Sequence, residues 1–131
     1  MQLRVELTDD AFDDLKRYSR SGNLHLFLKK LVALEENGEQ ASLPLGGNLK
    51  GWRKIPVGDR DWRIVFCSDP AWTVATIWVI GDRADSECYD LAKHRIQQLK
   101  GSHPHAISLA AVMLQLNELF RATKKEARRK K

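Results

Sequence analysis

The spacing of apolar side chains divides the chain into a strand, two helices, three strands and two further helices. Strict alternation over residues 3–7 predicts a half-buried strand. Apolar residues at helical spacing over 11–18 and 24–34 predict two helices, which Gly22 and Gly38 end. The short connection between them predicts a helical hairpin.

The middle of the chain changes to a strand pattern. Residues 52–57, 62–67 and 72–80 are rich in β-branched and aromatic side chains, and turn-forming residues separate them at 58–61 and 69–70. We expect an antiparallel meander. Its third strand is apolar almost throughout, so it should be central and covered on both sides.

Two more helices complete the pattern. Ser86 can cap one that runs to about Lys100, and Pro104 suits the first turn of the other. The first strand and the meander should share one sheet, with the helical hairpin on one face. We therefore predict an α+β fold of two layers, with an antiparallel sheet (β-α-α-β-β-β-α) and an additional C-terminal helix. Residues 1–101 should form the domain, and 102–131 a helix and basic tail that is not an independent domain.

The net charge of +5 is unevenly distributed. Of the 22 Lys and Arg and 17 Asp and Glu, residues 121–131 hold seven basic and one acidic, so the first 120 hold 15 basic and 16 acidic. The tail therefore carries +6 and the rest of the chain −1. Two interpretations of this basic tail stay open: it is a solvated end of the chain, or it binds RNA phosphates.

Several classes of function lack their signatures in the sequence. No apolar run follows a basic start, and the longest apolar stretch is too short to span a membrane, so we expect a soluble cytoplasmic protein. No His or Cys pair has zinc-ligand spacing, no Gly-rich phosphate loop follows a strand, and we expect no cofactor or metal. Cys67 and Cys88 fit unpaired core thiols. The acidic residues near the first helix are explained as helix-start residues; they are Asp9, Asp10, Asp13 and Asp14.

A cluster of cations on the meander is the remaining candidate for chemistry. Residues 49–63 contain five basic and two acidic side chains; the basic ones are Lys50, Arg53, Lys54, Arg60 and Arg63. Lys54 and Arg63 should lie on neighbouring strands and converge on one face. Solvated surface charges remain the simpler explanation of this spacing alone.

The stretch from Gly51 to Ile96 resembles the second half of RelE-type toxins of the RelE/ParE superfamily. The strings Arg53–Val57 and Trp62–Phe66 are similar to the family's central hairpin. The more specific string runs from Gly81 to Tyr89 and on through Lys93–Ile96, and is similar to the closing motif. The preceding helices match only in order and length.

This resemblance implies the toxin of a type II toxin–antitoxin system, a ribosome-dependent endoribonuclease. Such enzymes cleave mRNA in the A site without a metal, with the RNA 2′-hydroxyl as nucleophile. By position, Lys54 falls on the family's base, Arg63 on the arginine that binds the phosphate, Arg83 on the acid or charge stabiliser, and Tyr89 on the tyrosine that orients the nucleotide. We assign Arg53, Arg60 and Lys50 to substrate binding.

Three features depart from the family pattern. Pro56 stands where RelE has a second basic residue, and it must lie at a strand edge or bulge. The near-neutral core differs from the strongly basic RelE. Cys88, and not the histidine of some related toxins, precedes Tyr89, which favours the branch with Lys and Arg at the site.

The resemblance also implies partners and alternatives. The partners are a cognate antitoxin, the ribosome and mRNA, with operator DNA bound only through the antitoxin, and no membrane. The C-terminal helix must bury its apolar residues, on its own sheet, in a homodimer or against the antitoxin. The alternative functions are a ParE-like inhibitor of DNA gyrase and a non-catalytic RNA-binding protein that uses the tail.

Overall fold

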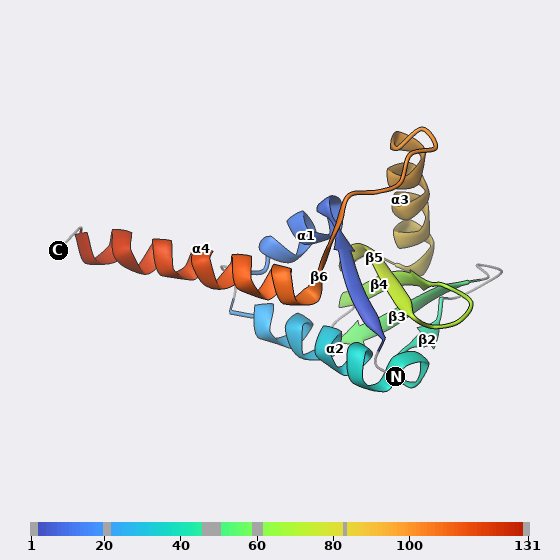
Figure 1. Cartoon of the computed structure of the whole chain (residues 1–131), viewed down its shortest axis with the longest axis horizontal. Helices are drawn as coiled ribbons and strands as arrows, with labels where there is room; N and C mark the ends of the chain where they lie inside the picture. Colours follow the sequence, from blue (N-terminus) through green and yellow to red (C-terminus); the bar gives the residue numbers. More distant parts are fainter. Residues whose placement is uncertain (1–2, 20–21, 46–50, 59–61, 83, 130–131) are drawn as a thin grey trace.

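A computed structural model describes residues 3–19, 22–45, 51–58, 62–82 and 84–129. The elements in chain order are β1 (Arg4–Thr8), α1 (Asp9–Lys16), α2 (Leu24–Asn37), the 3-10 helix η1 (Gly38–Ala41), β2 (Leu43–Pro44), β3 (Trp52–Val57), β4 (Trp62–Ser68), β5 (Val74–Gly81), α3 (Asp85–Gln98), β6 (Ala106–Ser108) and α4 (Leu109–Arg129). Figure 1 shows α4 projecting from one side of the body.

The strands form one sheet in the order β2-β3-β4-β5-β1-β6. The predicted meander is confirmed, because β3, β4 and β5 pair antiparallel in sequence. The expectation of a wholly antiparallel sheet is wrong in one place, since β1 runs parallel to β5. The chain between these two strands contains the hairpin of α1 and α2 and the strands β2, β3 and β4, so β1 and β5 are neighbours in the sheet but distant in the chain. A long connection is what parallel neighbours require.

The larger core lies on the face covered by α2. Alternate residues of β3 and β4 point into it, among them Ile55, Ile64 and Phe66, and they meet Phe27 and Leu31 of α2. Three residues of α4 join the same core, namely Leu109, Val112 and Leu116. The start of α4, from Leu109 to Leu116, therefore shares the core of the rest of the chain and packs on its own sheet.

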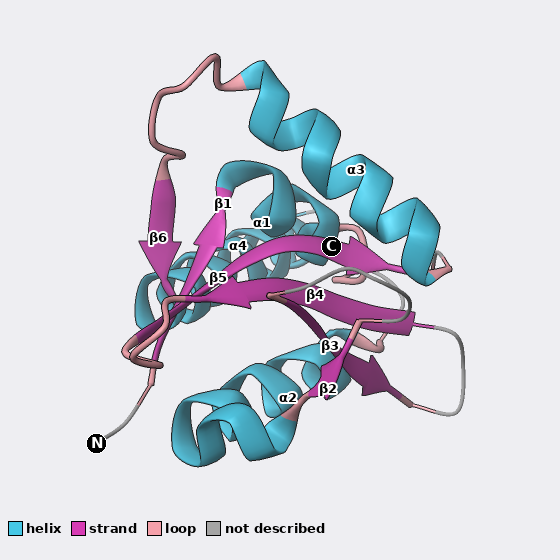
Figure 2. Ribbon diagram, turned by 90° about the vertical axis from the view of Figure 1, so that its right-hand side faces the viewer, coloured by secondary structure: helices cyan, strands magenta, loops and turns pink. Residues whose placement is uncertain are grey.

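The helix α3 covers the opposite face, as Figure 2 shows. Its residues Cys88 and Ala92 pack on Val65 and Val79 in a second, smaller core. A β-bulge makes this possible: Val65 pairs with Val79 but Phe66 pairs with Ile77, which leaves Trp78 as an extra residue. The helices therefore lie on both faces of the sheet, and β5 is covered on both sides as its composition predicts.

Three helix boundaries differ from the sequence pattern. Ser86 does not cap α3 as predicted, because α3 begins at Asp85 and Ala84 is its N-cap. The helix α1 ends at Lys16, six residues before Gly22, and Tyr18 then stacks on Phe27 at a centroid distance of 4.4 Å. Pro104 does not begin α4; a short strand, β6, follows it and pairs with β1 before α4 starts at Leu109. The end of α1 and the start of α4 coincide with tertiary contacts, which no local pattern encodes.

The ends of the other elements agree more closely with the sequence. Thr8 caps α1 as predicted, because its hydroxyl oxygen accepts a hydrogen bond from the Ala11 amide at 3.2 Å. The basic tail continues α4 as a helix up to Arg129. Within the residues that the structure describes, no helix has the length and apolar character needed to cross a membrane.

Candidate active site

The predicted convergence of Lys54 and Arg63 is present in the structure. Lys54 pairs with Val65 and Pro56 pairs with Arg63, so the two cations are diagonal neighbours on adjacent strands. Both point away from the main core, because Ile55 alternates to the other face. This places them on the face that α3 covers.

The first residue of α3 joins the two cations. Lys54 Nζ donates to Oδ2 of Asp85 at 2.7 Å, and Arg63 Nη1 donates to Oδ1 of the same carboxylate. The three side chains are 23%, 15% and 21% exposed, so the cluster lies at the rim of the core and remains open to solvent. Asp85 was not among the predicted site residues, since an acid in the first turn of a helix is explained by the helix dipole alone.

Tyr89 lies one helical turn after Asp85 and so on the same side of α3. Its ring meets that of Trp52 edge-on, with centroids 6.0 Å apart, and Lys93 Nζ lies 5.3 Å from the Tyr89 ring centroid. Trp52 is two residues before Lys54 on the same face of β3. An aromatic pair therefore borders the cationic pair.

Pro56 lies at a strand edge, as its missing amide hydrogen requires. The two-residue strand β2 pairs only with Lys54 and Arg53, so β3 has no second neighbour at Pro56 among the described residues. The Pro56 side chain is exposed next to Arg63. Proline thus leaves the pairing of β3 with β4 intact.

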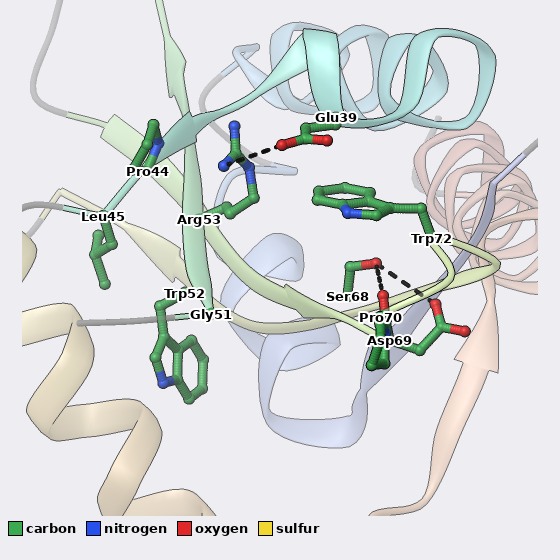
Figure 3. Close-up of a pocket in the computed structure, with 10 residues that line it drawn as sticks. All are labelled: Glu39, Pro44, Leu45, Gly51, Trp52, Arg53, Ser68, Asp69, Pro70 and Trp72. Atoms are coloured by element: carbon green, nitrogen blue, oxygen red, sulfur yellow. Dashed lines mark hydrogen bonds and ion pairs between the residues drawn. The ribbon is translucent and has the colours of Figure 1, made fainter.

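Arg53 lies on the other face of β3, away from Lys54 and Arg63. Its Nε donates to the Ser42 hydroxyl at 2.7 Å, and its guanidinium lies 5.6 Å from the Trp72 ring centroid. Arg53, Trp72 and Glu39 line an open pocket, shown in Figure 3. The structure therefore does not bring Arg53 into the cluster on the α3 side.

Three other predicted residues, Lys50, Arg60 and Arg83, lie outside the described residues. Gly81, two positions before Arg83 in the chain, pairs with Arg63. For these three residues the assignments stay predictions.

A buried ion pair holds α3 against the rest of the fold. Arg95 of α3 binds Asp14 of α1 through two nitrogens, at 2.8 and 3.0 Å, and Arg95 Nη1 also donates to the Trp78 carbonyl at 2.7 Å. Asp14 accepts the Ile80 amide as well, at 3.0 Å, beyond the point where β1 stops pairing with β5. The interpretation of Asp14 as a helix-start residue is wrong; it is 3% exposed and links three elements.

The charge balance around Arg95 follows from this pairing. Burial lowers the pKa of Arg95, but the hydrogen bonds and charge of Asp14, with Asp10 and Asp13 nearby, outweigh burial and raise it overall. The guanidinium is therefore held in its charged form, and α3 carries Asp85 and Tyr89 to fixed positions. The sequence contains a weak indication of this role for Asp14, because Asp14 lies on the same helical face as the apolar residues Ala11 and Leu15.

The two cysteines form no disulfide. Cys88 is fully buried beneath α3, and burial raises the pKa of the Cys67 thiol to about 12. A thiol in this state is a poor nucleophile near neutral pH. Among the described residues, no group of three His, Cys, Asp or Glu is arranged to hold a metal ion.

Comparison with known proteins places the fold. No protein-family model and no curated protein matches the chain. Among solved structures, the chain is similar to a double arginine-to-alanine mutant of the Escherichia coli toxin RelE in the free state, with a TM-score of 0.53 and 23% identity over 73% of this chain and 99% of that one.

A chain of the toxin–antitoxin complex RelBE2 from Mycobacterium tuberculosis is also similar. Its TM-score is 0.51 and its identity 19%, over 63% of this chain and all of that chain. At these identities the likeness is one of fold. The α+β fold expected from the resemblance to RelE-type toxins is thereby confirmed, and part of this chain extends beyond the matched region.

Proposed function

We propose that this protein is the toxin of a type II toxin–antitoxin system, a ribosome-dependent endoribonuclease that cleaves mRNA in the A site. The observation that carries the proposal is the convergence of Lys54 and Arg63 on one face of a RelE-like sheet, with Tyr89 on the adjacent helix. Fixed positive charge beside an aromatic ring suits a phosphodiester and its base.

The proposed reaction needs no metal. The 2′-hydroxyl of the RNA attacks the adjacent phosphorus, the bond to the 5′-oxygen breaks, and a 2′,3′-cyclic phosphate forms. Lys54 would take the proton of the 2′-hydroxyl, and Arg63 would stabilise the charge that develops on the phosphate. Arg83 would serve the leaving oxygen as acid or charge stabiliser, and Tyr89 would orient the nucleotide.

Three further basic residues are part of the proposed RNA-binding surface. Lys50, Arg53 and Arg60 are proposed to bind substrate phosphates. Arg53 could do so only along the edge of β3, because its guanidinium lies on the face opposite to Lys54. Its contribution should therefore be to binding and not to the chemical step.

An antitoxin is the proposed protein partner. The RelBE2 structure is a toxin–antitoxin complex, and its chain shares the fold described here. We propose that a cognate antitoxin covers the site in the cytoplasm, and that operator DNA is bound only through the antitoxin. A homodimer through α4 is a further proposed assembly.

Primer extension on a reporter mRNA, from cells that express this chain, tests the proposal. We expect cuts within translated codons, and their loss in an Arg63→Ala variant that is still folded by circular dichroism. An uncut message in arrested cells would contradict the nuclease proposal and favour inhibition of DNA gyrase. No cuts and no arrest would favour the non-catalytic RNA-binding alternative.

A further inference from the structure

We infer that the carboxylate of Asp85 is an internal competitor for the phosphate that Lys54 and Arg63 bind. In the free protein this carboxylate occupies the anion site, and an RNA phosphodiester must displace it. The inference rests on the proposed function for its choice of RNA as the incoming anion and for the roles of Lys54 and Arg63 in the reaction.

The geometry of the cluster supports this role. Each oxygen of Asp85 accepts from a different cation, Oδ2 from Lys54 and Oδ1 from Arg63. The two non-bridging oxygens of a phosphodiester can bridge a pair of donors in the same way, and both anions carry one negative charge. The structure thus shows the cation pair already shaped around a bidentate anion.

The occupied site also conflicts with the proposed chemistry. Lys54 can accept the proton of a 2′-hydroxyl only as the neutral amine, whereas in the observed ion pair it is a charged donor to Asp85. Arg63, likewise, cannot use the same nitrogen fully for Asp85 and for a phosphate. The nuclease reaction at Lys54 and Arg63 therefore requires Asp85 to leave first.

The position of Asp85 permits this movement. It is the first residue of α3, so rotation about its own side-chain torsions moves the carboxylate without breaking the helix. The cluster is partly exposed, and an ion pair with some access to solvent exchanges partners at lower cost than a fully buried one. By contrast, the Arg95 pair with Asp14 anchors the same helix in the buried core, so α3 can stay in place while Asp85 turns away.

A purely structural tie is the competing explanation. In that case Asp85 would serve to fasten α3 to the hairpin of β3 and β4, and its removal would lower stability without changing the affinity for anions. The two roles differ in their effect on binding. This difference makes them separable by experiment.

The test measures binding of a fluorescent single-stranded RNA whose 2′-hydroxyls are methylated, so that it cannot be cleaved by 2′-hydroxyl attack. Anisotropy titrations compare the unsubstituted chain with Asp85→Asn, which keeps the side-chain shape. Glu87→Gln is the matched control, because Glu87 is an exposed carboxylate in the same helical turn and its removal changes the net charge equally. Urea unfolding of each variant reports stability separately.

We expect Asp85→Asn to lower the Kd about tenfold relative to Glu87→Gln. Adding Arg63→Ala to Asp85→Asn should abolish this gain. Equal affinities of Asp85→Asn and Glu87→Gln, or no measurable binding by either, would overturn the inference. If the reporter mRNA is cleaved but Asp85→Asn binds RNA no more tightly, the proposed function is supported and the inference about Asp85 is wrong. If Asp85→Asn binds RNA more tightly but the reporter mRNA is not cleaved, the inference is supported and the proposed function is wrong.

Discussion

The packing contacts of Tyr89 involve its ring and not its hydroxyl. The ring already meets Trp52 and Lys93. We expect Tyr89→Phe to keep these contacts, to change the free energy of unfolding by less than about 0.5 kcal/mol, and to lower cleavage by at least about 100-fold. Relief of growth arrest on expression, with unchanged urea unfolding, is the measurement.

Arg83→Ala is the companion variant. We expect it also to relieve growth arrest while the fold stays intact. If both variants remained fully toxic, the assignment of Tyr89 and Arg83 to the active site would be wrong.

Cys67 offers a second test at the level of one residue. Because burial raises its pKa to about 12, the thiol should stay protonated near neutral pH. We expect alkylation of the folded protein by iodoacetamide, in neutral buffer, to be far slower than for a free cysteine, and to reach that rate only after unfolding in urea. Rapid labelling of the folded protein, located by peptide mass mapping, would contradict this account.

At the scale of elements, the contact between α1 and α3 depends on one buried ion pair. Asp14→Ala leaves the Arg95 guanidinium, which is 13% exposed, without its main counter-charge. We expect a loss of about 3 kcal/mol in the free energy of unfolding, measured by urea titration. Asp13→Ala is the control: its pair with Lys16 is exposed and should contribute less than about 0.5 kcal/mol.

The turn between β4 and β5 provides a pH-dependent prediction. Hydrogen bonds from the Thr73 hydroxyl and from the Val74 and Thr73 amides lower the pKa of Asp69. A lowered pKa means that Asp69 stabilises the fold above the unfolded value of about 3.9, and that this contribution disappears as pH falls through the folded value. The Tm of Asp69→Ala should therefore lie below that of the natural chain at about pH 6, and the difference should shrink steadily below about pH 4. A difference that stayed constant through the acid range would argue against it.

At the scale of the whole molecule, charge is concentrated at one end. The helix α4 extends to Arg129 and carries most of the +6 segment away from the body (Figure 1). If this segment binds RNA phosphates, replacing Lys124, Lys125, Arg128 and Arg129 by Gln should make the RNA-binding constant depend less steeply on salt concentration in a plot of log K against log salt concentration. The slope should change by about 0.7 for each of these side chains that binds a phosphate. Lys29→Gln with Lys30→Gln, on the exposed side of α2, is the control.

The same variant separates the tail from the active site. Its cuts in a reporter mRNA should stay at the same codons, because Lys54 and Arg63 are unchanged. An unaltered salt slope would show that the segment is only a solvated end of the helix.

Local pattern determined most of the elements and the proximity of the two cations of the proposed site. The strand at 52–57 and the helix at 24–37 follow from periodicity, and the start of α1 follows from the cap at Thr8; both kinds of signal act over a few residues. The antiparallel register of β3 and β4 likewise makes Lys54 and Arg63 diagonal neighbours, as the short separation of the two strand patterns predicts.

Only the tertiary structure decided what those two cations contact. Asp85 lies 31 residues after Lys54, and it reaches the cluster because α3 folds back across the sheet. Asp14 and Arg95 are 81 residues apart in the chain. The parallel pairing of β1 with β5 likewise joins residues that are distant in the chain, such as Arg4 and Val74. Such contacts depend on how whole helices and strands pack against one another, and no short stretch of the sequence specifies that packing.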